Sequence, residues 1–189
     1  MGFRSLLTRI SIVFLFLLIS CSSVKGAKRV SGEAVMYGMV YNNENTPVSN
    51  AEVIVDGKSV AITDVQGRFI LFSKQRKEFT IALVKPGYET IEGNFRFEPS
   101  DVIHMVMINA DQLVKLAEFA MDEGRYREVI AFCDRALALN LERIDAYYIK
   151  ALCWIRLREY DCARHILRDL QKQFGEREYI RRVLEELPK

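Results

Sequence analysis

The sequence predicts an α+β multidomain protein in which an antiparallel β-sandwich over residues 33–108 is followed by an all-α domain over residues 109–189. Two observations predict this fold class. In the first stretch, short runs of β-branched and aromatic residues are separated by turn residues about every 8–12 positions, which is typical of a sandwich. From Asn109 onward, the apolar residues instead recur with the period of about 3.6 that indicates helices.

Composition and charge exclude several classes of protein. Half of the residues are hydrophobic and 11% are aromatic, which excludes a disordered chain, and four cysteines are too few for a small disulfide-stabilised scaffold. The formal net charge of +2 comes from Arg4 and Arg9, because residues 1–20 hold no acid and the rest of the chain has equal numbers of basic and acidic residues. We therefore expect no nucleic-acid-binding surface.

Residues 1–20 have the pattern of an export signal. Arg4 and Arg9 precede an apolar run over residues 10–19. A basic start followed by about 7–15 apolar residues is typical of a secretory signal peptide, and the run is shorter than the roughly 20 residues that a transmembrane helix needs.

The end of this signal indicates how the chain is attached. Residues 18–21 read Leu-Ile-Ser-Cys and resemble the lipobox of bacterial lipoproteins. That resemblance implies cleavage before Cys21 and acylation of its thiol, so that residues 21–32 form a lipidated cysteine and a short tether; the alternative is an ordinary signal peptide whose run ends in cysteine. We expect a membrane-anchored protein of the bacterial cell envelope that faces the periplasm or the cell exterior. The same resemblance implies that Ser rather than Asp at position 22 favours the outer membrane over the inner one, as it does in enterobacterial lipoproteins.

About seven strands are expected in the β domain. Turn signals separate them: Asp56-Gly57 is typical of a tight hairpin, residues 64–67 form a turn, and Pro86-Gly87 suits the centre of a type II turn. The expected strands are Val35–Tyr41, Ala51–Val55, Lys58–Ile62, Arg68–Phe72, Phe79–Val84, Tyr88–Phe97 and Val102–Ile108. Their alternation points four side chains into the core, namely Val53, Val55, Phe69 and Leu71.

Four motifs in this stretch occur in the order of a known family. They are Gly38-x-Val40, Pro47-Val48-x-x-Ala51-x-Val53-x-Val55, Thr63-Asp64-x-x-Gly67-x-Phe69 and Lys85-x-Gly87-Tyr88. Together they resemble the carboxypeptidase regulatory-like domain, which implies a transthyretin-like (prealbumin-like) β-sandwich that serves as a spacer or a binding module. A smaller bacterial surface repeat rich in Pro-Glu-Gly-Ala ranks second, because Asp56-Gly57-Lys58 fits it but the tetrapeptide itself is missing.

Five helices are expected after Asn109. They cover about residues 110–123, 127–139, 144–157, 160–173 and 177–187, and Asn109 with Gln112 resembles a capping box for the first of them. The sequence also matches itself at a spacing of 34 residues, which aligns Ala117 with Ala151 and Tyr126 with Tyr160.

This helix–turn–helix period of about 34 residues resembles the tetratricopeptide repeat. The resemblance implies repeats over 110–143 and 144–177, followed by a C-terminal capping helix; an unrelated pair of helical hairpins is the alternative. The second repeat departs from the family at Lys150, Arg158 and Leu170.

The same resemblance implies a partner-binding groove on the first helix of each repeat. The implied lining residues are Asp111, Val114, Glu118, Met121, Asp145, Tyr148, Leu152, Ile155 and Arg156. Such a groove suits an amphipathic peptide segment of another protein, with Tyr148 as an aromatic anchor. The alternative is that some of these apolar residues pack on the fifth helix or on the sandwich and leave no open groove.

Known catalytic and metal-binding patterns are missing from the sequence, so we expect no enzyme, no cofactor and no metal site. His104 is expected to be a partly buried strand residue, with a catalytic base as the alternative. The loop over residues 42–45 is expected to be a solvated loop, with a cation or sugar site as the alternative. Cys133, Cys153 and Cys162 are expected to be free, partly buried thiols, and the alternative is a bridge between Cys153 and Cys162.

Two functions from different classes remain after these observations. The leading one is a non-enzymatic envelope lipoprotein that acts as a protein–protein interaction, scaffold or assembly module through its helical repeats. The alternative is a binder of cell-envelope glycan or a small ligand through the loops of the sandwich, for which Tyr37, Tyr41, Tyr88 and Phe95 are the candidate aromatic residues.

Overall fold

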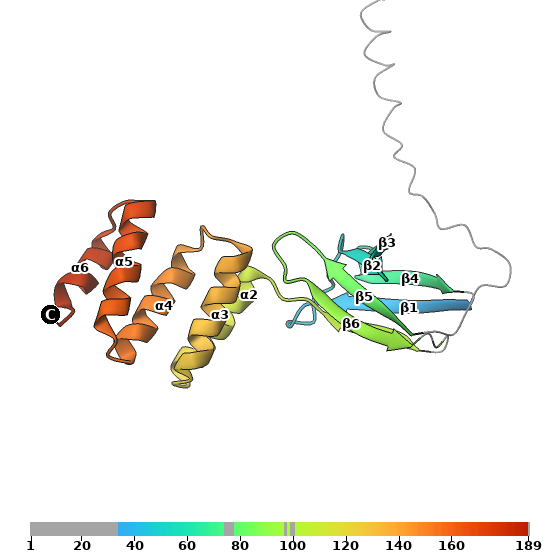
Figure 1. Cartoon of the computed structure of the whole chain (residues 1–189), viewed down its shortest axis with the longest axis horizontal. Coiled ribbons are helices and arrows are strands. Elements are labelled where there is room, and N and C mark those ends of the chain that lie inside the picture. The colour runs from blue at the N-terminus through green and yellow to red at the C-terminus, as the bar shows by residue number, and fades with distance from the viewer. Residues whose placement is uncertain (1–33, 74–77, 97, 99–100, 189) are drawn as a thin grey trace, which may run out of the picture. The chain divides into compact units, whose positions relative to one another are not determined.

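The computed structural model describes residues 34–73, 78–96, 98 and 101–188, which form seven strands followed by five helices (Figure 1). The strands are β1 (Ala34–Tyr41), β2 (Glu52–Val55), β3 (Lys58–Ile62), β4 (Arg68–Ser73), β5 (Glu78–Val84), β6 (Ile91–Arg96) and β7 (Val102–Val106). The helices are α2 (Ala110–Asp122), α3 (Tyr126–Leu139), α4 (Ile144–Arg156), α5 (Tyr160–Phe174) and α6 (Glu178–Glu186). The predicted α+β layout is confirmed. The predicted signal peptide, Cys21 and tether lie outside the described residues.

The strands form two sheets, one in the order β4-β1-β7 and one in the order β3-β2-β5-β6. The expectation that every pair is antiparallel is wrong at one place, because β1 and β7 run parallel, with Tyr37 opposite Val102 and Tyr41 opposite Val106. Turn signals determine the direction of strands that follow one another in the chain. Nearly the whole β region separates β1 from β7, so no turn sets their relative direction.

The inner sides of both sheets share one hydrophobic core. Val53 of β2 and both Phe69 and Leu71 of β4 are buried in it, as the alternation predicts, whereas Val55 is only partly buried at its margin. The other buried side chains include Met36 and Val40 of β1, Ile81 and Leu83 of β5, and Ile103 and Met105 of β7.

The first helix begins with the predicted capping box. The side chain of Asn109 accepts a hydrogen bond from the backbone N–H of Gln112, at 2.9 Å, and the side-chain oxygen of Gln112 accepts one from the backbone N–H of Asn109, at 3.3 Å. These two bonds satisfy amide groups that have no partner within the helix, and they define where the helical part starts.

Corresponding helices of the two predicted repeats begin at equivalent positions, one period apart. Ala110 and Ile144 start α2 and α4, and Tyr126 and Tyr160 start α3 and α5. The small residues Ala117 and Ala151 are fully buried where the paired helices approach each other.

The last helix, α6, packs on the α4–α5 pair. Ile180 and Leu187 are buried with Ala151, Ala163 and Leu167 in one cluster. None of the five helices in the described part of the chain combines the length and the apolar content needed to cross a bilayer.

Candidate functional site

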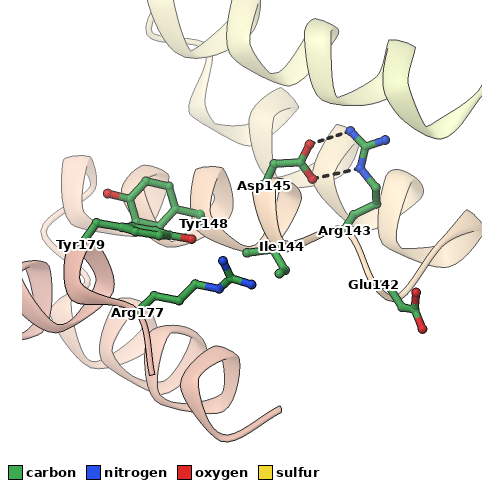
Figure 2. A pocket seen from close by; sticks show the side chains of 7 residues that line it. All are labelled: Glu142, Arg143, Ile144, Asp145, Tyr148, Arg177 and Tyr179. Carbon is green, nitrogen blue, oxygen red and sulfur yellow. Dashed lines mark hydrogen bonds and ion pairs between the residues drawn. The ribbon is translucent and has the colours of Figure 1, made fainter. Parts of the chain in front are cut away.

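A pocket of about 520 Å³ lies where the start of α4 meets the start of α6 (Figure 2). It is lined by Glu142, Arg143, Ile144, Asp145, Tyr148, Arg177 and Tyr179. The first five come from the loop before α4 and from its first turns, and the last two come from the beginning of α6. The pocket therefore depends on the packing of α6 against α4.

One wall of the pocket is an ion-pair network around Arg143. The guanidinium donates two hydrogen bonds to the carboxylate of Asp145, at 2.9 and 2.6 Å, and a third to Asp111 of α2. The bonds from Arg143 hold the pKa of the Asp145 carboxyl below its ordinary value, and those from Asp145 and Asp111 raise the pKa of Arg143. Because two carboxylates neutralise this one guanidinium, Arg143 offers no unpaired positive charge to a ligand.

The opposite wall is a pair of tyrosines. The rings of Tyr148 and Tyr179 meet edge to face, with their centroids 5.1 Å apart and their planes at 90°. This is a favoured aromatic geometry because the positive edge of one ring meets the negative face of the other. Burial raises the pKa of Tyr148, and the neighbouring Tyr179 adds to that shift. Tyr179 remains 43% exposed, so the pair presents apolar surface to a ligand.

Arg177 is the cation of this pocket that has no charged partner among the residues that the structure describes. Its backbone precedes α6, and Figure 2 shows its side chain pointing into the pocket, while Glu142 lies at the far end. Within the described residues, no ion pair or hydrogen bond joins the Arg177 guanidinium to another side chain. The arrangement places a positive charge beside the two aromatic rings and the aliphatic side chain of Ile144.

Two of the nine predicted groove residues, Asp145 and Tyr148, line this pocket directly, and Asp111 is joined to it through Arg143. Val114 is 5% exposed and belongs to a core cluster with Leu113 and Ala136, so its side chain has no free surface for a partner. Val114 is buried because it lies on the side of α2 that faces α3 and α4.

The other predicted groove residues lie on the same helices outside the pocket. Met121, Leu152 and Ile155 are partly buried, and Ile155 packs at the margin of the cluster that contains Ile180 of α6. Glu118 and Arg156 are exposed. Helix α6 thus covers part of the α4 surface.

Sequence reasoning missed five lining residues: Glu142, Arg143, Ile144, Arg177 and Tyr179. An arginine two positions before an aspartate at the start of a helix is a local signal, and it could have identified the Arg143–Asp145 pair. The helical period places Tyr179 only on the apolar side of the last helix. Its contact with Tyr148 joins two helices that are not consecutive in the chain, and no local pattern shows that contact.

The two histidines and the loop after β1 have ordinary structural surroundings. His104 is exposed on β7 rather than partly buried as expected, and His165 lies 3.2 Å from Asp169 on α5. The amide oxygen of Asn42 accepts hydrogen bonds from the backbone N–H groups of Glu44 and Thr46, which fold the loop over residues 42–45 into a turn. Among the described residues, no three His, Cys, Asp or Glu side chains are grouped closely enough to hold a metal ion.

The four aromatic residues considered for ligand binding come from three places in the β half, since Tyr37 and the partly buried Tyr41 are both on β1. Tyr37 is exposed in the middle of β1, and Tyr88 follows β5 with the ammonium group of Lys85 4.8 Å from its ring centre. Phe95 of β6 packs against Phe79 with ring centroids 6.4 Å apart, at the margin of the core. They therefore form no single aromatic platform.

Comparison with protein-family models and with curated proteins finds no match to this chain.

Proposed function

We propose that this protein is a non-enzymatic lipoprotein of the bacterial cell envelope, anchored through Cys21, whose helical half binds a segment of another envelope protein. The lipobox-like residues 18–21 support the anchor. The pocket between α4 and α6 supports the binding role, because it brings an unpaired cation, two aromatic rings and an aliphatic side chain to one place.

The β half fits the proposal that it is a carboxypeptidase regulatory-like sandwich. Two sheets with one common core are the arrangement that such a domain needs. The motif residues Val40, Val53 and Phe69 are buried in that core, which gives the motif a packing role. In this proposal the β half is the spacer between the anchor and the helices.

The helical half fits the proposal of two tetratricopeptide-like repeats and a capping helix. Gly124 and Arg158, which are one repeat period apart, both have positive φ, at 70° and 62°. The backbone N–H of each donates to the carbonyl three positions earlier, that of Met121 or Ile155, at 3.0 Å. Equal turns at equivalent positions support a true repeat over a chance pair of hairpins.

The observation that carries the binding role is the unpaired Arg177 beside Tyr148 and Tyr179. An arginine next to aromatic rings forms a strong anchor for a carboxylate, and the rings bury an adjacent apolar side chain. The ligand of this pocket is therefore a peptide segment in which an acidic residue neighbours an apolar one.

Site-specific photo-crosslinking in living cells tests this role. A photoreactive phenylalanine analogue is placed at Tyr179 of the full chain, or at Phe119, an exposed aromatic residue of α2 that serves as the matched control. We expect a discrete protein adduct from position 179 that disappears when Arg177→Glu is added, and no such adduct from position 119. Equal adducts from both positions, or an adduct that survives Arg177→Glu, contradict the proposal.

A further inference from the structure

The three-stranded sheet has an apolar outer face as well as an apolar inner one. In β1 the side chains that alternate with the buried Met36 and Val40 are Tyr37, Met39 and Tyr41. The register places Tyr37 between Ile70 of β4 and Val102 of β7. The outward-facing positions on the three strands are Val35, Tyr37, Met39, Tyr41, Arg68, Ile70, Phe72, Val102, His104 and Val106.

This face is exposed to solvent although nearly all of it is apolar. Tyr37 and Val106 are each 51% exposed, Ile70 is 45% exposed and Val102 is 43% exposed. No outward position carries an acid, and the one permanent charge, Arg68, is paired with Asp64 at 2.9 Å. An antiparallel or mixed sheet with one solvated face normally alternates apolar with polar residues, and the outer face of this sheet departs from that pattern.

The tether joins the sheet at one end of this face. Residue 34 begins β1, and the registers bring the end of β4 and the start of β7 to the same end of the sheet, since Val35 lies opposite Phe72 and Tyr37 lies opposite Val102. Thirteen residues, 21–33, connect that end to Cys21. At about 3.3–3.6 Å per residue they span at most about 43–47 Å. A lipid attached at Cys21 thus keeps the apolar face within reach of the bilayer surface.

We propose that the outer face of the β4-β1-β7 sheet lies against the lipid surface of the membrane to which the chain is anchored. The inference rests on the proposed lipidation of Cys21. Tyr37 and Tyr41 supply rings with one polar end, which favour the boundary between headgroups and acyl chains. The acyl groups provide the affinity, and the sheet face fixes which side of the domain meets the membrane.

A second copy of the chain fits this face less well. Three strands about 4.8 Å apart with five residues of about 3.3 Å each cover a patch of roughly 15 by 17 Å. A stable protein interface needs about 800 Å² from each partner, which is several times this area. A lipid surface has no such minimum, because the anchor already holds the chain there.

Fluorescence quenching by brominated lipids tests the contact. The chain has one tryptophan, Trp154 in α4, which is replaced by Phe so that Tyr37→Trp or Ile62→Trp supplies a single probe. Ile62 is the matched control because it is an exposed strand residue, 65% exposed, on β3 of the other sheet. The acylated mature chain is reconstituted into phosphatidylethanolamine and phosphatidylglycerol vesicles with and without bromine on the acyl chains.

We expect the Tyr37→Trp probe to shift its emission to shorter wavelength on vesicles and to lose intensity on the brominated ones, while the Ile62→Trp probe changes in neither respect. Equal behaviour of the two probes overturns the proposal. A lipid-free dimer that Ile70→Glu dissociates also overturns it, because a second copy then covers the face.

Failure of the lipidation is measured separately. Intact mass shows whether Cys21 carries acyl groups. If it does not, the same probes are compared on a chain beginning at residue 21 whose N-terminal hexahistidine tag binds nickel-chelating lipid. Selective quenching of the Tyr37→Trp probe on those vesicles supports the sheet-face contact even though the Cys21 proposal has failed, and absence of quenching there overturns it.

Discussion

Arg158 adopts a backbone conformation that favours glycine. Its φ of 62° matches the 70° of Gly124 at the equivalent turn of the preceding helix pair. A residue with a Cβ atom is strained in this left-handed region, because Cβ approaches the following carbonyl oxygen. The sequence showed that glycine is missing at this position, and the structure shows that the turn keeps its shape, so we expect Arg158 to be strained there.

Arg158→Gly is therefore expected to stabilise the protein by about 1 kcal/mol, since release of the strain exceeds the extra entropy that glycine loses on folding. The reciprocal change, Gly124→Ala, is expected to destabilise it by about 1–2 kcal/mol. Urea unfolding followed by the helical circular dichroism signal measures both. A lower free energy of unfolding for Arg158→Gly contradicts this account of the turn.

The three helical cysteines differ in how reactive their thiols are expected to be. Cys133 and Cys153 are fully buried, and Cys162 is exposed. Burial raises the pKa of Cys133 to about 12 and also raises the pKa of Cys153. The thiolate is the reactive form, so both buried cysteines are protonated and shielded at neutral pH.

Alkylation of the native protein at pH 8 is expected to modify Cys162 readily and to modify Cys133 and Cys153 only after unfolding. Peptide mapping of the alkylated chain measures each site. The structure has all three thiols free. Recovery of a peptide with a Cys153–Cys162 disulfide, or rapid labelling of Cys133 in the folded chain, contradicts this expectation.

At the residue scale, the sequence was informative where a side chain acts locally. The Asn109–Gln112 capping box was predicted and is present, because both residues belong to one helical turn. Asp145 and Tyr148 were predicted on the surface of α4 and line the pocket. Arg177 was not predicted, because its relevance depends on α6 folding back to Tyr148.

At the scale of elements, strands β1 and β4 pack closely at one position, where Gly38 lies opposite Phe69. The Phe69 ring lies over Gly38, and a Cβ atom at position 38 would lie 2.0 Å from the end of that ring. Glycine is needed there because the ring occupies the space of the missing side chain.

Gly38→Ala is therefore expected to cost about 1–3 kcal/mol, the usual range for overpacking a core. The same substitution in a Phe69→Leu background is expected to cost less, because the shorter side chain leaves room for the methyl group. Thermal unfolding of the two single variants and the double variant gives the coupling energy. Additive effects show that the ring contact is not the reason for glycine at position 38.

The order and limits of the elements could be predicted from the sequence with small errors, because turn residues and period changes are local. The pairing of β1 with β7 could not, since hydrogen bonds between the first and last strands depend on how the whole β half closes. The covering of α4 by α6 was left open for the same reason: contact between amphipathic faces depends on tertiary packing.

At the scale of the whole molecule, the proposed lipid anchor at Cys21 predicts that the chain is acylated and associates with membranes. The substitution Cys21→Ser is expected to abolish incorporation of a labelled palmitate analogue and to move the chain from the membrane fraction to the soluble fraction. Cys162→Ser is the matched control, because it removes an exposed thiol outside the lipobox-like segment. Label that persists in Cys21→Ser, or that is lost in Cys162→Ser, contradicts the assignment.

The proposed binding role requires the α4–α6 pocket to recognise an acidic and apolar segment of a partner through Arg177. The most direct measurement is the affinity of the crosslinked partner, once purified, for the mature chain and two charge-reversal variants. Arg177→Glu lies in the pocket, and Arg168→Glu reverses another exposed arginine, on α5. We expect at least about tenfold weaker binding, or about 1.4 kcal/mol, for Arg177→Glu and unchanged binding for Arg168→Glu. Equal affinities of all three chains contradict it.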